Sequence, residues 1–133
     1  MSTHFATYEE PTIRAFFPID KREKYVLILG KSNRRPDGLK ILHHEVLFDP
    51  KWSTRIEPGS DVPAMLRTRG AGSRAYLVGT SRDQSILPLE DAVALVENES
   101  GILVCTPARL AYYSGPGGKR RFILERGAPP SAR

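Results

Sequence analysis

The sequence predicts a single α+β domain: a mixed β-sheet of about six strands with two helices. Three observations lead to this prediction. Apolar runs of strand length recur along the chain, two segments carry helix signals, and eleven glycines with eleven prolines imply many turns. The length of 133 residues suits one compact domain, which we expect over residues 12–126, with flexible tails at 1–11 and 127–133 that lack apolar periodicity.

Three strands are predicted in the first part of the domain. Residues 12–18 (TIRAFFP) have strand composition, and residues 24–30 (KYVLILG) form a continuous apolar run that suits a strand covered on both faces. Residues 39–48 (LKILHHEVLF) alternate in the manner of a half-buried strand. Between the last two, Pro-Asp-Gly at 36–38 has turn chemistry, so we expect an antiparallel ribbon.

Two helices are predicted further along the chain. A short helix near 61–69 follows from Ser60 or Asp61 as a cap, and from Pro63, which the first helical turn tolerates. A longer amphipathic helix near 87–98 is the strongest helix signal, because four apolar residues recur at i, i+3, i+4 and i+7. They are Leu89, Ala92, Val93 and Val96.

Four further strands are predicted in the second half, over residues 74–79, 101–106, 110–113 and 120–126. The first two flank the longer helix, and we therefore expect a strand-helix-strand unit with parallel strands and a right-handed crossover. The last two flank a glycine-rich hairpin loop (SGPGGK).

Charge is segregated along the chain. The net charge is +5, yet residues 83–99 hold five carboxylates and no base, while three windows at 31–40, 66–82 and 119–126 are strongly basic. Nucleic acid presents a line of phosphates, so a binder needs cations gathered on one face. If folding brings the windows together, the residues that would bind a polyanion are Lys31, Arg34, Arg35, Arg67, Arg69, Arg74, Lys119, Arg120 and Arg121.

These features favour a small, soluble, non-catalytic binding protein whose basic loops bind nucleic acid or another polyanion. An alternative is a protein-interaction or regulatory module that recognises an acidic protein surface. Self-association is also open, because the acidic helix could face the basic segments of another copy.

An enzyme is the second alternative, with a site around His43, Glu45 and Cys105. His43-His44-Glu45 contains the His-x-Glu of zinc deaminases, but the Pro-Cys-x-x-Cys half of that signature is missing. Cys105 could act as a nucleophile beside a histidine, yet it lies within an apolar strand, where cysteine is usually inert. We therefore expect no catalytic residue and no metal.

Gly30-Lys31-Ser32 matches the end of a nucleotide-binding P-loop, but the context is wrong. The motif needs a glycine where this chain has Tyr25, and it needs a helix to follow, where the sequence indicates a turn. No cofactor is expected from this or any other motif.

The compartment is predicted from the single cysteine and the N-terminus. One cysteine per chain excludes an internal disulfide, which favours a reducing cytoplasm. The N-terminus has no basic segment followed by an apolar core, and no apolar run reaches membrane-spanning length. A cytoplasmic protein with no membrane contact is the expectation.

Overall fold

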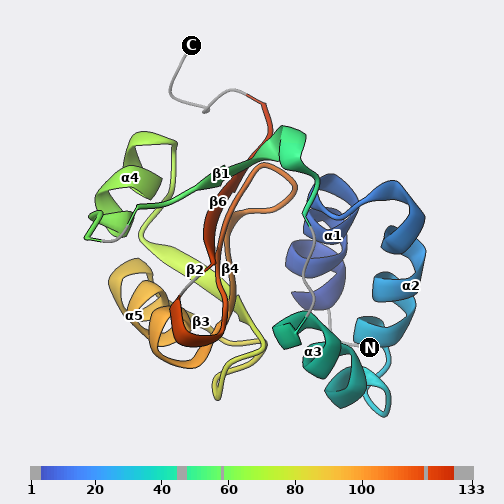
Figure 1. The fold of residues 1–133 in the computed structure, drawn as a ribbon. Helices are drawn as coiled ribbons and strands as arrows, with labels where there is room; N and C mark the ends of the chain where they lie inside the picture. The colour runs from blue at the N-terminus through green and yellow to red at the C-terminus, as the bar shows by residue number, and fades with distance from the viewer. Residues whose placement is uncertain (1–3, 45–47, 58, 119, 128–133) are drawn as a thin grey trace.

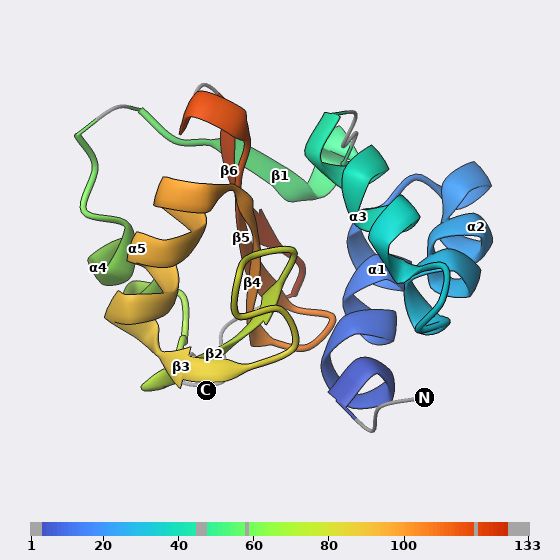
Figure 2. The same cartoon turned by 90° about the horizontal axis from the view of Figure 1, so that it is seen from below.

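The protein folds into three layers, with a central antiparallel sheet between two sets of helices (Figure 1; Figure 2). The computed structural model describes residues 4–44, 48–57, 59–118 and 120–127, with the backbone alone for residues 42–44. In both views α1, α2 and α3 lie on one side of the sheet and α4 and α5 on the other. The predicted single α+β domain is confirmed.

The N-terminal layer is helical. It consists of a π-helical turn at Phe5–Glu9, α1 (Glu10–Phe16), α2 (Ile19–Gly30) and α3 (Arg35–His44). A 3₁₀ turn at Pro50–Trp52 leads into the sheet. The strands are β1 (Ser53–Arg55), β2 (Arg74–Val78), β3 (Ile86–Pro88), β4 (Gly101–Thr106), β5 (Leu110–Ser114) and β6 (Arg121–Glu125). The second helical layer holds α4 (Val62–Thr68) and α5 (Leu89–Glu99).

The sheet has the strand order β1-β6-β5-β4-β2-β3. Each neighbouring pair is antiparallel, so the expected mixed sheet is corrected to an antiparallel one. In particular, the strands at 74–79 and 101–106 are not a parallel unit. The chain turns back through the unpredicted strand β3 before α5, and β4 therefore returns antiparallel to β2.

The sheet separates two apolar cores because successive side chains of a strand point to opposite faces. Tyr76, Val78, Ile102 and Val104 pack under the N-terminal helices. Their neighbours in the same strands, such as Leu77 and Leu103, pack under α4 and α5 with Leu89, Val93 and Val96 of the amphipathic helix. Because both faces of the sheet are covered by helices, successive residues of the central strands are apolar.

Both predicted helices are confirmed, and so are the four strands of the second half. The Asp61 carboxylate accepts a hydrogen bond from the Ala64 amide at 3.2 Å, which caps α4, and Pro63 lies in its first turn. In α5 the four apolar residues that predicted the helix are all buried.

The three strands predicted before residue 49 are wrong: this part of the chain is helical. In α2 the apolar run at 24–30 buries Tyr25 and Leu29, four residues apart, while Leu27 between them is exposed. That is the helical period, and the strand prediction failed because a short apolar run does not distinguish a strand from a helix. Pro18 precedes the helix as its N-cap, and the charged residues at 20–24 belong to its first turns, which gives a helix of twelve residues.

The predicted turn at 36–38 instead begins α3. Pro36 and Asp37 lie in its first turn, where proline and acidic residues are favoured. Gly38 faces α2: a Cβ there would come within 2.6 Å of Ile28 Cγ2, so glycine lets the two helices pack closely. The expected ribbon is thus a pair of packed helices, and residues 45–47 at the end of the predicted strand 39–48 lie outside the described residues.

The N-terminal segment expected as a loose tail is built into the fold over residues 5–11. Phe5 and Glu9 are buried there, so the domain begins before residue 12. Residues 128–133 of the predicted C-terminal tail lie outside the described residues.

Candidate functional site

Arg35, which we predicted to bind a polyanion, is buried and paired. Its Nη1 and Nη2 donate to the two carboxylate oxygens of Glu9 at 2.8 and 2.9 Å. Its Nε and Nη2 donate to Asp83 at 2.7 and 2.8 Å, and Nη1 also donates to the Leu29 carbonyl at 2.9 Å. The guanidinium therefore joins α3 to the N-terminal turn and to the β2–β3 loop, and it is not available to a ligand.

The carboxylates around Arg35 are held by further bonds. The Tyr76 hydroxyl donates to Glu9 Oε1, and the Gly79 amide donates to Asp83 Oδ1, each at 2.8 Å. Burial raises the pKa of Glu9; Arg35 opposes this effect and the nearby charge of Asp83 adds to it. Burial likewise raises the pKa of Tyr76, so its hydroxyl stays protonated and can donate. The cluster therefore consists of the Arg35 guanidinium and the two carboxylates of Glu9 and Asp83.

Three more of the predicted cations form ion pairs. Arg67 pairs with Glu90 and Arg121 pairs with Glu97, both on the acidic helix α5. Arg69 Nε lies 3.2 Å from Glu125 Oε1. The acidic helix thus neutralises part of the basic windows within the same chain.

The predicted cations are also divided between the two helical layers. Lys31 and Arg34 lie between α2 and α3, whereas Arg67 and Arg69 belong to α4 and its end, across the sheet (Figure 1; Figure 2). Arg74 begins β2, and Arg120 precedes β6. Lys119 lies outside the described residues.

A surface that the sequence did not predict lies on the outer side of α2. Ile19 is 78% exposed and Leu27 is 58% exposed, and they are the large hydrophobic residues that stand out from the surface within the described part of the chain. With Glu23 they follow an i, i+4, i+8 row, and Glu23 is paired with Arg14 of α1. Three exposed cations lie on the same helix or just beyond its end: Lys24, Lys31 and Arg34. We call these six residues the α2 surface.

Sequence reasoning missed Ile19 and Leu27 because residues 24–30 were interpreted as a buried strand. The signal that could have found them is the same row read at helical spacing: Ile19, Glu23 and Leu27 lie opposite Tyr25 and Leu29 on a helical wheel. In the helix α2 only the side that carries Tyr25 and Leu29 is buried.

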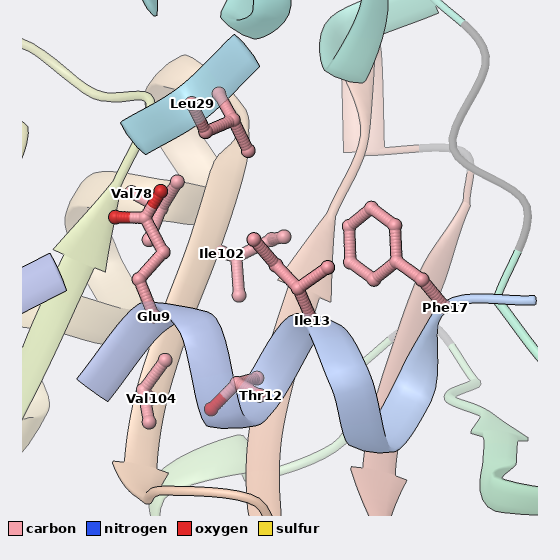
Figure 3. Close-up of a pocket in the computed structure, with 8 residues that line it drawn as sticks. All are labelled: Glu9, Thr12, Ile13, Phe17, Leu29, Val78, Ile102 and Val104. Carbon is pink, nitrogen blue, oxygen red and sulfur yellow. The ribbon is translucent and has the colours of Figure 1, made fainter. Parts of the chain in front are cut away.

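The close contact of α1 with the sheet leaves one small cavity of about 10 Å³. Figure 3 shows Glu9, Ile13 and Phe17 projecting from the N-terminal helices towards Ile102 and the neighbouring strands. This volume holds about one water molecule, and most of its lining is apolar. The cavity is a packing gap and too small for a ligand.

The residues of the alternative enzyme site do not form a described cluster. Cys105 packs against the core under α4 and α5, and burial raises the pKa of its thiol to about 12. His43 lies in α3 with its side chain outside the described part, as does the whole of Glu45. Within residues that the structure describes, no three His, Cys, Asp or Glu side chains are placed to hold a metal ion.

No protein-family model, curated protein or solved structure matches this chain. Across the described ranges, none of the helices combines the length and the apolar character needed to cross a bilayer. The fold and the surface chemistry are therefore the basis for a functional proposal.

Proposed function

We propose that the protein is a non-catalytic interaction module whose α2 surface binds an acidic protein. The single observation that carries this proposal is the presence of exposed Ile19 and Leu27 beside the cations Lys24, Lys31 and Arg34. We also propose that it acts in the cytoplasm, since its one cysteine suits a reducing compartment.

The α2 surface combines the two chemistries that a protein interface needs. Ile19 and Leu27 are about 12 Å apart along the helix axis, at 1.5 Å per residue, so each can enter a separate pocket of a partner. When a partner covers large exposed apolar side chains, their removal from water stabilises the complex. The flanking cations add attraction to an acidic rim and accelerate association.

The distribution of charge supports a protein partner over nucleic acid. A polyanion binder gathers its cations on one face, whereas here Arg35 is buried and Arg67, Arg69 and Arg121 pair with carboxylates. The cations left on the α2 surface accompany apolar residues, which phosphate contacts do not require. Nucleic-acid binding through Lys31 and Arg34 is the competing outcome of the test.

The test compares variants in affinity capture from a lysate of the organism that encodes the protein. The wild type is expected to retain one stoichiometric partner, and the double variant Ile19→Ser/Leu27→Ser to lose it. Ala94→Ser, on the exposed side of α5, is the matched control and is expected to retain it. The purified partner is then titrated at increasing salt, where Lys31→Gln/Arg34→Gln is expected to weaken binding and flatten its salt dependence.

A parallel titration uses mixed-sequence single-stranded RNA and duplex DNA at low salt. We expect no saturable binding. Binding that requires Lys31 and Arg34 but is unchanged by the Ile19→Ser/Leu27→Ser variant would overturn the proposal in favour of a polyanion. A partner retained equally by the wild type and by the double variant would also overturn it, because the α2 surface would then not be the contact.

A further inference from the structure

A second surface feature, separate from the α2 surface, lies beside the π-helical turn, over strands β2, β3 and β4. A groove of about 340 Å³ opens there, which falls within the size range of small-molecule sites. Its lining comes from the π-helical turn and from strands β2, β3 and β4: Tyr8, Arg74, Ala75, Tyr76, Ile86 and Val104, with Cys105 at the strand end.

The floor of the groove is one face of the sheet. Tyr76 is paired with Ile86 on β3 and with Val104 on β4, so these three side chains lie on the same face. Arg74 precedes Tyr76 by two residues, shares this face and is exposed, whereas the rest of β2 is buried. Tyr76 and Val104 are buried beneath the groove, so its accessible lining is Ile86 together with Tyr8, and the exposed guanidinium of Arg74 lies at its end.

The two tyrosine rings beside the groove, Tyr8 and Tyr76, are held in place by contacts that do not involve a ligand. The rings of Tyr8 and Tyr76 stack with centroids 5.0 Å apart and an angle of 11° between their planes. The Tyr76 hydroxyl is bound to Glu9, which Arg35 in turn holds. Because the stacking contact holds Tyr8 and the hydrogen bond holds Tyr76, the groove is formed before any ligand arrives, and a ligand need not order it.

The charge that lines the groove is positive. Arg74 supplies its charged group, no carboxylate lines it, and no described carboxylate pairs with Arg74. Glu9 follows Tyr8 in the chain but is turned towards Arg35. An exposed arginine beside the partly exposed Tyr8 ring and Ile86 side chain favours a ligand with a carboxylate and a flat ring, since guanidinium binds carboxylate in two-pronged geometry and the ring covers apolar area.

We propose that this groove binds a small aromatic or heteroaromatic carboxylate, whose ring lies along the partly exposed Tyr8 and Ile86 and whose carboxylate pairs with Arg74. An exposed ion pair alone contributes little, so the ring contact is required for affinity. A neutral analogue of the same shape keeps that contact and loses the pairing. The two halves of the site can therefore be tested separately.

The experiment follows backbone amide shifts of the ¹⁵N-labelled protein during titration with indole-3-acetate and, separately, with its neutral amide, indole-3-acetamide. We expect saturable shifts at residues 74–76 and 86 with the carboxylate, and binding of the amide at least about fivefold weaker. Arg74→Gln is expected to lower the affinity for indole-3-acetate to that for indole-3-acetamide. Arg82→Gln, an exposed arginine of the β2–β3 loop, is the matched control and is expected to change neither titration.

Equal affinity for the two probes, or no effect of Arg74→Gln, would overturn the proposal, because the guanidinium would then not select the ligand. Shifts confined to other parts of the molecule, or no saturation at concentrations up to about 10 mM, would overturn it as well. The spectrum of Arg74→Gln itself reports whether that variant is folded. These outcomes do not depend on a partner protein. A failure of the ligand proposal can therefore be distinguished from a failure of the proposal that the α2 surface binds a protein.

Discussion

Arg35 and Glu9 face each other through two parallel hydrogen bonds of 2.8 and 2.9 Å, with side chains that are 9% and 3% exposed. The pair joins residues 26 positions apart and ties the first turn of the chain to α3. Arg35, which the sequence predicts to be a surface cation, is thus a buried residue that links two parts of the N-terminal helical layer. Its pairing determines how the protein should respond to mutation and to pH.

Removing one partner of this pair is expected to destabilise the fold more than removing both. Glu9→Leu leaves the buried guanidinium with Asp83 as its one carboxylate partner, and we expect it to lower the free energy of unfolding by about 3 kcal/mol. The double variant Glu9→Leu/Arg35→Met replaces the pair by apolar contact and should recover a large part of that loss. Urea unfolding followed by the fluorescence of Trp52, the one tryptophan, measures both. A double variant as unstable as the sum of the single ones would contradict the pairing.

The raised pKa of Glu9 predicts a pH dependence with a definite sign. Because the folded state holds the Glu9 proton more tightly than the unfolded state, it binds more protons above the ordinary pKa of 4.5. The Glu9 contribution to stability is therefore complete below pH 4.5 and is lost as pH rises through the folded-state pKa. Glu9→Gln cannot titrate, so the difference in unfolding free energy between wild type and this variant should change across that window. A difference that is constant with pH would refute the assignment.

Gly101 is expected to be intolerant of a side chain. Its φ is +155°, and a Cβ would lie 2.7 Å from the Val78 carbonyl oxygen of the adjacent strand, which is backbone and cannot rotate away. We expect Gly101→Ala to destabilise the protein by at least about 2 kcal/mol. Gly72→Ala is the control, since a Cβ there meets nothing within 4 Å, and it should be neutral or slightly stabilising. Thermal unfolding of the two variants beside the wild type gives the comparison.

Cys105 should react slowly in the folded protein. Burial raises its thiol pKa to about 12, so at pH 8 only about one molecule in ten thousand carries the reactive thiolate. Alkylation by iodoacetamide is expected to be at least about a hundredfold slower in the native state than in urea, as followed by mass spectrometry. Native and unfolded rates within a factor of a few would show an activated cysteine and revive the enzyme alternative.

The sequence by itself determined most helices and strands of the second half of this protein, but neither strand β3 nor the antiparallel pairing of β2 with β4. The apolar spacing of α5, the Asp61 cap of α4 and the four predicted strands at 74–79, 101–106, 110–113 and 120–126 are local signals, and the structure agrees with each of them. The expected mixture of strands and helices also sufficed for the α+β class. Such features depend on residues a few positions apart, which is the range over which periodicity and capping act.

Tertiary structure decided the first half and the availability of the charges. The run at 24–30 fits a strand or a helix, and only its packing on α3, through Gly38, selects the helix and exposes Leu27. Whether an arginine faces solvent or a carboxylate depends on residues far away in the chain: 26 positions separate Arg35 from Glu9, and 48 separate it from Asp83. Burial and ion pairing arise from such distant contacts, and no local pattern encodes them.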